Sequence, residues 1–380
     1  MLRPLPCRLR SVLLLLALVP LLAHGQIPAE TAQKIDELVQ AEMARQKIPG
    51  LTVAIGRDGR IVYSKAFGLA DVENSVPVKA STVFRTASIA KPMTATAVMQ
   101  LAEQGKLDLD APIQKYCPAF PEKPWPVTAR QLLGHLGSVR HYTRPGEASG
   151  TEHFYTLADS LRIFKDDPLL HEPGTRYHYS TFGYVLLGCA VEGASGMPYD
   201  RYMAERVFAP AGMARSRTDD HFTPIHDRTR GYLVLSQQLY DGLPDSAKAN
   251  YTVGGIYNST LHDTSMKIPG GGLVSTSEDL VRFLFALRAG KLVKPDTLAQ
   301  MWTPQKPKDG QATTYGLGWG ISTVEGGTLI QHTGGQSGTS TVVAYRADKG
   351  LVIAVMSNLQ GAGVSRLAAQ IAALLLSAAP

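Results

Sequence analysis

The segments that favour β-structure lie near the two ends of this chain, with a helical middle between them. Residues 51–68 contain two β-rich runs on either side of an Asp-Gly pair, which is a strong β-hairpin signal. Three further runs, at residues 328–335, 340–346 and 351–357, also have the composition of strands. We therefore predict one antiparallel sheet of five strands, contributed by both ends of the chain.

Helical periodicity characterises most of the other segments. Apolar spacing predicts an amphipathic helix over residues 29–46 and a closing helix from about Ser365 to Ser377, and we expect these two helices to cover the sheet. Four segments of the middle also favour helices: 88–105, 154–165, 181–194 and 198–208. The predicted fold class is α+β, a single domain over residues 26–380. Its parts are an α/β portion at about 26–85 and 270–380 and a helical insert at about 86–269.

The first 25 residues are typical of a secretory signal. Three arginines precede an apolar run from Val12 to Ala23, and Ala23 and Gly25 are small residues at the minus-three and minus-one positions of a cleavage site. The run is too short to span a bilayer comfortably. We expect a signal peptide over residues 1–25, export to the periplasm or the exterior, and no stable membrane insertion after cleavage. The alternative is an uncleaved N-terminal anchor.

Charge and cysteine content narrow the range of partners. Removing the three arginines of the signal changes the formal net charge from +6 to +3, too small an excess to suggest nucleic acid or an anionic membrane. The sequence has no C-x-x-C and no H-E-x-x-H motif, so we expect no metal and no cofactor. Cys117 and Cys189 can pair in an oxidising compartment, but two cysteines do not decide whether they do.

A serine and a lysine three residues apart are the first candidate catalytic pair. On a helix, Ser88 and Lys91 share a face, so the amine can reach the hydroxyl. A neutral lysine can accept the serine proton if its pKa lies below the usual value near 10.4. Backbone N–H groups at the start of a helix also point towards developing negative charge. Taken alone, the motif equally fits a helix-capping serine followed by a solvated lysine.

Two later segments supply further candidates. Tyr179 precedes a predicted helix, where its phenol can project into a cleft and relay a proton. His332, Thr333, Gly334 and Gly335 end a predicted strand. There His332 can polarise substrate, Thr333 can donate a hydrogen bond, and the Gly335 N–H can join that of Ser88 in an oxyanion hole. The plainer interpretations are an interface tyrosine and a glycine turn beside a partly buried histidine.

The order Ser-x-x-Lys, Tyr and His-Thr-Gly resembles the serine β-lactamase and penicillin-binding-protein superfamily, over roughly residues 30–375. The resemblance is strongest to its class C branch, which includes family VIII carboxylesterases, D-amino-acid peptidases and the mitochondrial β-lactamase-like proteins. Other segments resemble family landmarks: Thr86-Ala87, Leu132–His135, Arg140–Tyr142, Pro173-Gly174, Pro269–Leu273, Tyr315–Trp319 and Ser357-Asn358.

The resemblance implies a role for each candidate. Ser88 is implied as the nucleophile, Lys91 as its base and Tyr179 as the proton relay to the leaving group. The implied substrate-binding residues are Thr181, His332, Thr333, Gly334 and Gly335. The implied reaction is acylation of Ser88 followed by hydrolysis, on a small-molecule or peptide substrate. Nothing in the sequence indicates the oligomeric state.

Two positions depart from true class C β-lactamases. These have Tyr-x-Asn and Lys-Thr-Gly, whereas this chain has Thr181 and His332. We therefore expect an exported serine hydrolase acting on an amide, peptide or ester bond. The alternatives are β-lactamase or D-alanyl carboxypeptidase activity, and a catalytically silent penicillin-binding-like sensor. A histidine titrating near pH 6.5 would also strengthen the binding of anionic substrates in acid.

Overall fold

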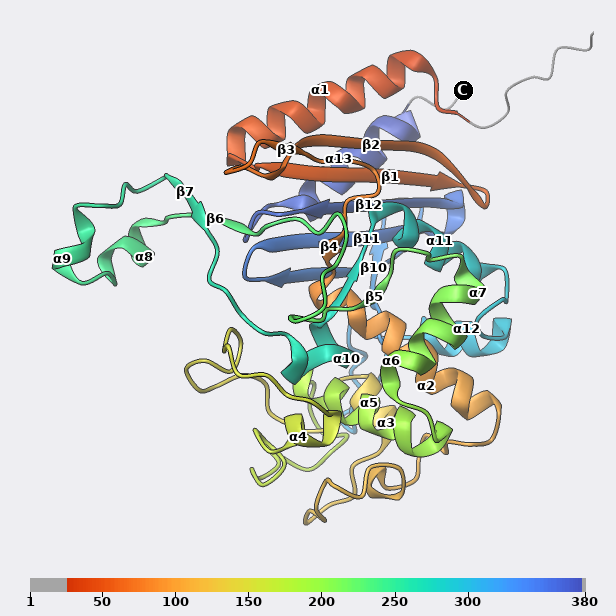
Figure 1. Ribbon diagram of the computed structural model, residues 1–380. Helices are drawn as coiled ribbons and strands as arrows, with labels where there is room; N and C mark the ends of the chain where they lie inside the picture. Colours follow the sequence, from red (N-terminus) through yellow and green to blue (C-terminus); the bar gives the residue numbers. More distant parts are fainter. Residues whose placement is uncertain (1–25, 378–380) are drawn as a thin grey trace, which may run out of the picture.

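The computed structural model describes residues 26–377, so the predicted signal peptide lies outside the described residues. A seven-stranded antiparallel sheet lies above a mostly helical part (Figure 1). Its strand order is β3-β2-β1-β12-β11-β10-β9. The strands are β1 Gly50–Arg57, β2 Arg60–Asp71, β3 Val76–Pro77, β9 Gly320–Val324, β10 Gly327–Gln336, β11 Thr339–Arg346 and β12 Leu351–Ser357.

The two ends of the chain meet where β1 pairs with β12. Leu51 lies opposite Ser357, and the antiparallel register runs to Arg57 opposite Leu351. Both strands are buried almost throughout because helices cover both faces of the sheet. On one face, α1 (Ala29–Gln46) and α13 (Val364–Ser377) pack on the apolar side chains, and α11 (Ser277–Arg288) covers the other.

The prediction of an α+β fold with a sheet built from both ends is confirmed, but the sheet has seven strands rather than five. The two additional strands lie at the edges. β3 has only two residues and β9 has five, too few to produce a clear alternation of apolar and polar residues.

The helical part is more interrupted than the sequence suggests. The expected helix over 154–165 is reduced to α4, and the one over 198–208 becomes α6 followed by a π-helical turn, Met203–Phe208. The helices of this part are α2 Ala90–Glu103, α3 Ala129–Leu133, α4 Leu157–Leu161, α5 Thr181–Ser195, α6 Tyr199–Tyr202, α7 Ala209–Ala211, α10 Ile268–Gly271 and α12 Pro295–Met301. Among residues 26–377, none of the helices has the length and hydropathy of a membrane span.

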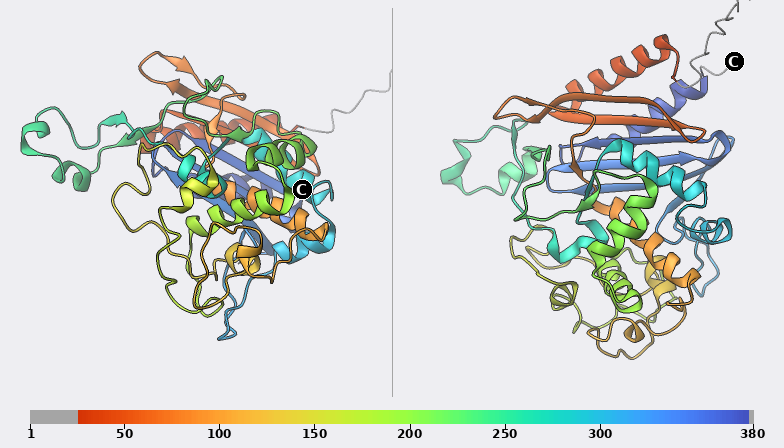
Figure 2. Two further views of the ribbon diagram at one scale, coloured as in Figure 1. Left: turned by 60° about the horizontal axis from the view of Figure 1, so that its bottom comes forward. Right: turned by 45° about the vertical axis from the view of Figure 1, so that its right-hand side comes forward.

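Two smaller sheets complete the fold. One has the order β4-β8-β5, from Phe84–Arg85, Leu273–Ser275 and Arg217–Thr218. The other pairs β6 with β7 at the base of an arm that projects from the body (Figure 1 and Figure 2). The arm consists of β6 Tyr232–Val234, α8 Gln237–Asp241, α9 Asp245–Lys248 and β7 Ile256–Asn258.

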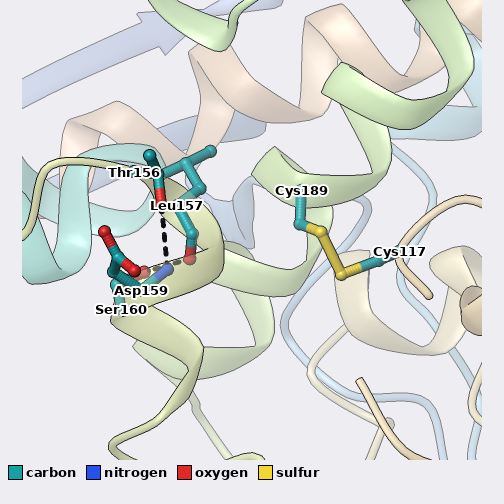
Figure 3. Close-up of a disulfide and its surroundings, with 6 residues drawn as sticks. All are labelled: Cys117, Thr156, Leu157, Asp159, Ser160 and Cys189. Carbon is teal, nitrogen blue, oxygen red and sulfur yellow. Dashed lines mark hydrogen bonds between the residues drawn. A yellow bond between two sulfur atoms is a disulfide. The ribbon is translucent and has the colours of Figure 1, made fainter. Parts of the chain in front are cut away.

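Cys117 and Cys189 form a disulfide, with their Cα atoms 5.4 Å apart (Figure 3). Cys189 lies on α5, and Cys117 lies in the segment between α2 and α3. The bond therefore joins the longest helix beside the candidate site to a segment 72 residues earlier in the sequence.

Candidate active site

Ser88 lies in a short 3-10 turn, Ala87–Ile89, directly before α2. The residue before it, Ala87, has a φ of 45°, a left-handed conformation that is unfavourable for a residue with a side chain. This turn brings Ser88 to the wall of a pocket of ≈ 530 Å³, whose other walls include Thr181 from α5, Gly271 from α10 and Gly335 from β10. Ser88 therefore faces the same cavity as residues far away in sequence.

Lys91 is fully buried beneath Ser88. Its Nζ lies 3.1 Å from Ser88 Oγ, 3.1 Å from Thr181 Oγ1 and 2.7 Å from the carbonyl oxygen of Gly270. Burial, and then the nearby charge of Lys267, lowers the pKa of Lys91 well below its ordinary value. A neutral amine has two N–H donors and one lone pair. It can donate to Gly270 and Thr181 and accept the proton of Ser88.

Tyr179 lies beside both Lys91 and Ser88. Its ring centre is 4.7 Å from Nζ of Lys91. Burial raises the pKa of the Tyr179 phenol, and a hydrogen bond with Ser88 opposes this rise only in part. Tyr179 is therefore a neutral phenol at neutral pH, able to pass a proton rather than hold a negative charge.

The end of β10 forms a further wall. Gly335 lines the pocket, and a side-chain carbon added there would meet no atom within 4 Å. At Gly334 an added side-chain carbon would lie on the opposite face of the strand, 2.3 Å from the carbonyl oxygen of Thr86. Thr333 is exposed on the same side of the strand as Gly335, outside the pocket lining. Glycine at 334 allows β10 to approach the segment that carries Ser88.

His332 lies on β10, three residues before Gly335. It lies on the buried face of β10, 6% exposed, and is not among the residues that line the pocket. Its Nδ1 is 2.7 Å from the carbonyl oxygen of Thr333, and its Nε2 is 2.8 Å from the hydroxyl of Tyr315. Burial, with the charge of Lys91 nearby, lowers the pKa of His332 to about 3. The ring is thus neutral at neutral pH, and the role of His332 in binding substrate stays a prediction.

Two histidines from segments that resemble family landmarks, His135 and His141, lie against the site. Nδ1 of His135 accepts the N–H of Ser180, and Nδ1 of His141 accepts the N–H of Thr181, each at 3.2 Å. Burial lowers the pKa of both rings, to about 4 for His141. Neutral histidines therefore orient the backbone that follows Tyr179, and His141 also lines the pocket.

Sequence reasoning missed Lys267, which lines the pocket although its side chain is almost wholly buried. Burial, and then the charge of Arg85, lowers the pKa of Lys267 to about 8. The local sequence offers one weak signal, a lysine just before the glycine run of α10. Among the described residues, no cluster of side chains suited to a metal ion occurs.

Comparisons with known proteins identify the family of this chain. The sequence model of the family described as "Beta-lactamase" matches residues 35–377. The mitochondrial serine beta-lactamase-like protein LACTB of Homo sapiens is 30% identical, over 85% of this chain and 76% of that protein. Esterase EstB of Burkholderia gladioli is 28% identical, over 77% of this chain and 79% of that protein.

Among solved structures, the D-amino acid amidase of Ochrobactrum anthropi complexed with D-phenylalanine has a TM-score of 0.79 and 25% identity. The match covers 92% of this chain and all of the amidase, 100%. The family resemblance that we inferred from Ser88, Lys91, Tyr179 and the end of β10 is thus supported by matches that extend over almost the whole chain. The chain belongs to the beta-lactamase family of serine hydrolases.

Proposed function

We propose that this protein hydrolyses an ester or amide bond through an acyl-enzyme at Ser88. The observation that carries the proposal is the buried Lys91, whose Nζ lies 3.1 Å from Ser88 Oγ and whose other two polar contacts are acceptors for its N–H groups. This arrangement leaves the lone pair for the serine proton. A solvated structural lysine would need no such surroundings.

In the proposed acylation step, Lys91 takes the proton of Ser88 as the oxygen attacks the acyl carbon. The N–H groups of Ser88 and Gly335 stabilise the negative charge on the carbonyl oxygen. Tyr179 donates its proton to the departing alcohol or amine and regains one from the Lys91 ammonium. Water then attacks the acyl-enzyme, and the proton transfers run in reverse to release the acid and regenerate Ser88.

The residues around this centre favour an esterase or amidase over an efficient β-lactamase. Thr181 takes the place of an asparagine, and its hydroxyl is already 3.1 Å from Nζ of Lys91. His332 takes the place of a lysine, and its ring is buried and bonded to Tyr315. The similar proteins include an esterase and a D-amino acid amidase by name.

We also propose that the protein works outside the cytoplasm. The signal-like residues 1–25 support this location, and so does the Cys117–Cys189 disulfide, because structural disulfides persist mainly in oxidising compartments. Fractionation of cells that produce the full chain, with N-terminal sequencing of the product, tests both points. A cytoplasmic product that retains residue 1 would overturn this part.

The nucleophile is tested with a neutral fluorophosphonate probe and mass spectrometry. Ser88→Ala should abolish labelling and reduce turnover by about 10³-fold or more. Ser337→Ala is the matched control, since Ser337 also lines the pocket but its hydroxyl donates to the carbonyl of Thr260. Labelling of Ser337, or labelling that persists in Ser88→Ala, contradicts the assignment.

The substrate class is tested with p-nitrophenyl esters, D-amino-acid amides, D-Ala-terminated peptides and nitrocefin. We expect turnover of esters or amides to exceed that of nitrocefin. The decay of the labelled acyl-enzyme separates an enzyme from a sensor. An adduct that forms on Ser88 and persists for hours with every substrate would favour the sensor.

A further inference from the structure

The charge of the pocket around Ser88 comes from a single residue of its lining. The described residues that line it include no aspartate, glutamate or arginine. His141 is there, but its lowered pKa, about 4, keeps the ring neutral. The one lining residue with an ammonium group is Lys267. A cavity with one cation and no carboxylate is complementary to an anion.

Lys267 has unused donors. Its Nζ donates to the carbonyl oxygen of Ala148 at 2.7 Å and lies 5.7 Å from the ring centre of Tyr142. An ammonium has three N–H donors. Within residues 26–377, the Ala148 oxygen is the one hydrogen-bond acceptor of this side chain; the charge of Asp219 acts on the ammonium, but from beyond salt-bridge distance. Two donors of an almost wholly buried cation are therefore left for a ligand.

The neighbouring buried and half-buried arginines do not share this property. Arg140 is paired with Glu147 and Asp167, and Arg85 is paired with Asp219. Since burying an unpaired charge is costly, pairing is the usual arrangement. Lys267 is the exception among these cations, and it is the one that faces the cavity.

The side chain also lies close to the reacting centre. A carbon added at Gly271 would lie 3.8 Å from Cδ of Lys267 and 3.9 Å from the carbonyl carbon of Ala87, the residue before Ser88. The absence of a side chain at Gly271 keeps open the space between Lys267 and the nucleophile segment. Lys267 directly precedes α10 and Gly335 lies on β10, and both of these elements contact the 3-10 turn Ala87–Ile89 that carries Ser88.

We propose that Lys267 is the anion-recognising residue of this pocket, and that the substrate is an ester or amide carrying a carboxylate that binds its ammonium. This inference rests on the proposed hydrolysis at Ser88 and adds the substrate class. The carboxylate can belong to the acyl part or to the leaving group, and the experiment separates these sources.

The experiment compares substrate pairs of equal size. For the acyl part, p-nitrophenyl monoesters of adipate and adipamate differ only in a terminal carboxylate or amide. For the leaving group, 4-acetoxybenzoate and 4-acetoxybenzamide differ in the same way. We expect the wild-type protein to prefer the carboxylate member of one pair by about 10-fold or more in kcat/KM, chiefly through a lower KM.

Three variants assign that preference. Lys267→Met and Lys267→Gln remove the charge, and glutamine keeps an N–H donor for the Ala148 oxygen. For the carboxylate member, both variants should lower kcat/KM by about 10-fold or more beyond any loss seen with the amide member. Lys267→Arg keeps a positive charge and should retain part of the preference for the carboxylate member. Lys123→Met is the control, because Lys123 also donates to backbone carbonyls but lies outside the pocket. It should keep the full preference.

A readout without turnover separates this inference from the proposed function. In the Ser88→Ala background, calorimetry measures binding of the same pairs with and without Lys267→Met. Carboxylate-selective binding that disappears with Lys267→Met supports the anion site even if Ser88 proves not to be the nucleophile. Equal losses on both members of each pair, or no carboxylate preference in either pair, overturn the assignment.

Discussion

The hydroxyl of Tyr315 lies 2.8 Å from Nε2 of His332, inside the protein and beneath the strand whose end lines the pocket. Because the carbonyl oxygen of Thr333 accepts a bond from Nδ1, the ring carries its proton there, and Nε2 accepts from the phenol. Both nitrogens are occupied. His332, which the resemblance places where the family has a lysine, is thus held as a neutral ring by two hydrogen bonds, and we expect the positive charge that faces the substrate to come from elsewhere in the pocket.

The first prediction follows from this neutrality. The pKa of His332 is lowered to about 3, so the ring does not titrate between pH 5 and 7. Lowering the pH through 6.5 should not strengthen binding of a carboxylate-bearing substrate by way of His332. The imidazole resonances of His332, assigned by comparison with His332→Phe, should keep their neutral position down to about pH 5. A shift centred near pH 6.5 would contradict this expectation.

Much of the fold could be predicted because its signals are local. The runs that became β1, β2, β11 and β12 are long and β-rich, and the hairpin between β1 and β2 turns at Asp58 and Gly59, both with positive φ. The spacing of Ser88 and Lys91 likewise implies contact, because both lie within one turn of helix. What depends on a few neighbouring residues can be read from the chain.

Other features of the site depend on tertiary packing. Whether His332 or Thr333 faces the inside of the protein depends on how β10 lies against Ala87 and Ser88, and both orientations fit the same strand pattern. The local sequence around Lys267 resembles that of many surface lysines. Its burial arises because the 3-10 turn Ser265–Lys267 packs against α4 and α5. Such residues are found only when distant segments are placed together.

The second prediction concerns Lys91 and the stability of the fold. Burial lowers the pKa of Lys91 in the folded protein well below the value of about 10.5 that it has in the unfolded chain. At a pH between these two pKa values, Lys91 therefore carries a proton in the unfolded chain but not in the folded protein. The free energy of unfolding of the wild type should therefore rise with pH relative to that of Lys91→Met, by up to about 1.4 kcal/mol per pH unit. Urea unfolding at pH 7.5 to 9.5 measures the difference.

Acylation by a fluorophosphonate in the same Lys91→Met variant should fall about 10³-fold or more, because the base is lost. Lys267 is present in both proteins, so its own titration largely cancels in the stability comparison. Parallel stability curves across this pH range would mean that Lys91 is charged in the folded protein, which is incompatible with its role as a base.

The third prediction compares two adjacent glycines. In Gly334→Ala the new carbon would lie 2.3 Å from the carbonyl oxygen of Thr86 and 2.4 Å from Oγ1 of Thr341. The backbone must shift, at a cost of about 1–3 kcal/mol, and with it the turn that carries Ser88. Both the free energy of unfolding and the rate of Ser88 labelling should decrease.

Gly335→Ala is the matched control for that strain, because no atom lies within 4 Å of the added carbon. Its stability should stay within about 0.5 kcal/mol of the wild type. The methyl group narrows the pocket instead, so kcat/KM should fall more for bulky acyl groups than for acetyl esters. Equal destabilisation of the two variants would mean that β10 does not approach the nucleophile segment as described.

The last prediction concerns the disulfide between Cys117 and Cys189. The bond joins residues 72 positions apart, so breaking it enlarges the conformational freedom of the unfolded chain. In a chain beginning at residue 26, the double variant Cys117→Ala/Cys189→Ala should lose about 2–4 kcal/mol of unfolding free energy in urea. Treating the wild type with a reductant should give a similar loss, and adding the reductant to the double variant should change nothing.

Catalytic activity at urea concentrations well below the unfolding transition should change little, because the start of α5 is oriented by His135 and His141 rather than by the disulfide. Two titratable thiols in the oxidised wild type, or an unfolding midpoint that is insensitive to reductant, would show that the bond does not form and would remove one support for an oxidising location.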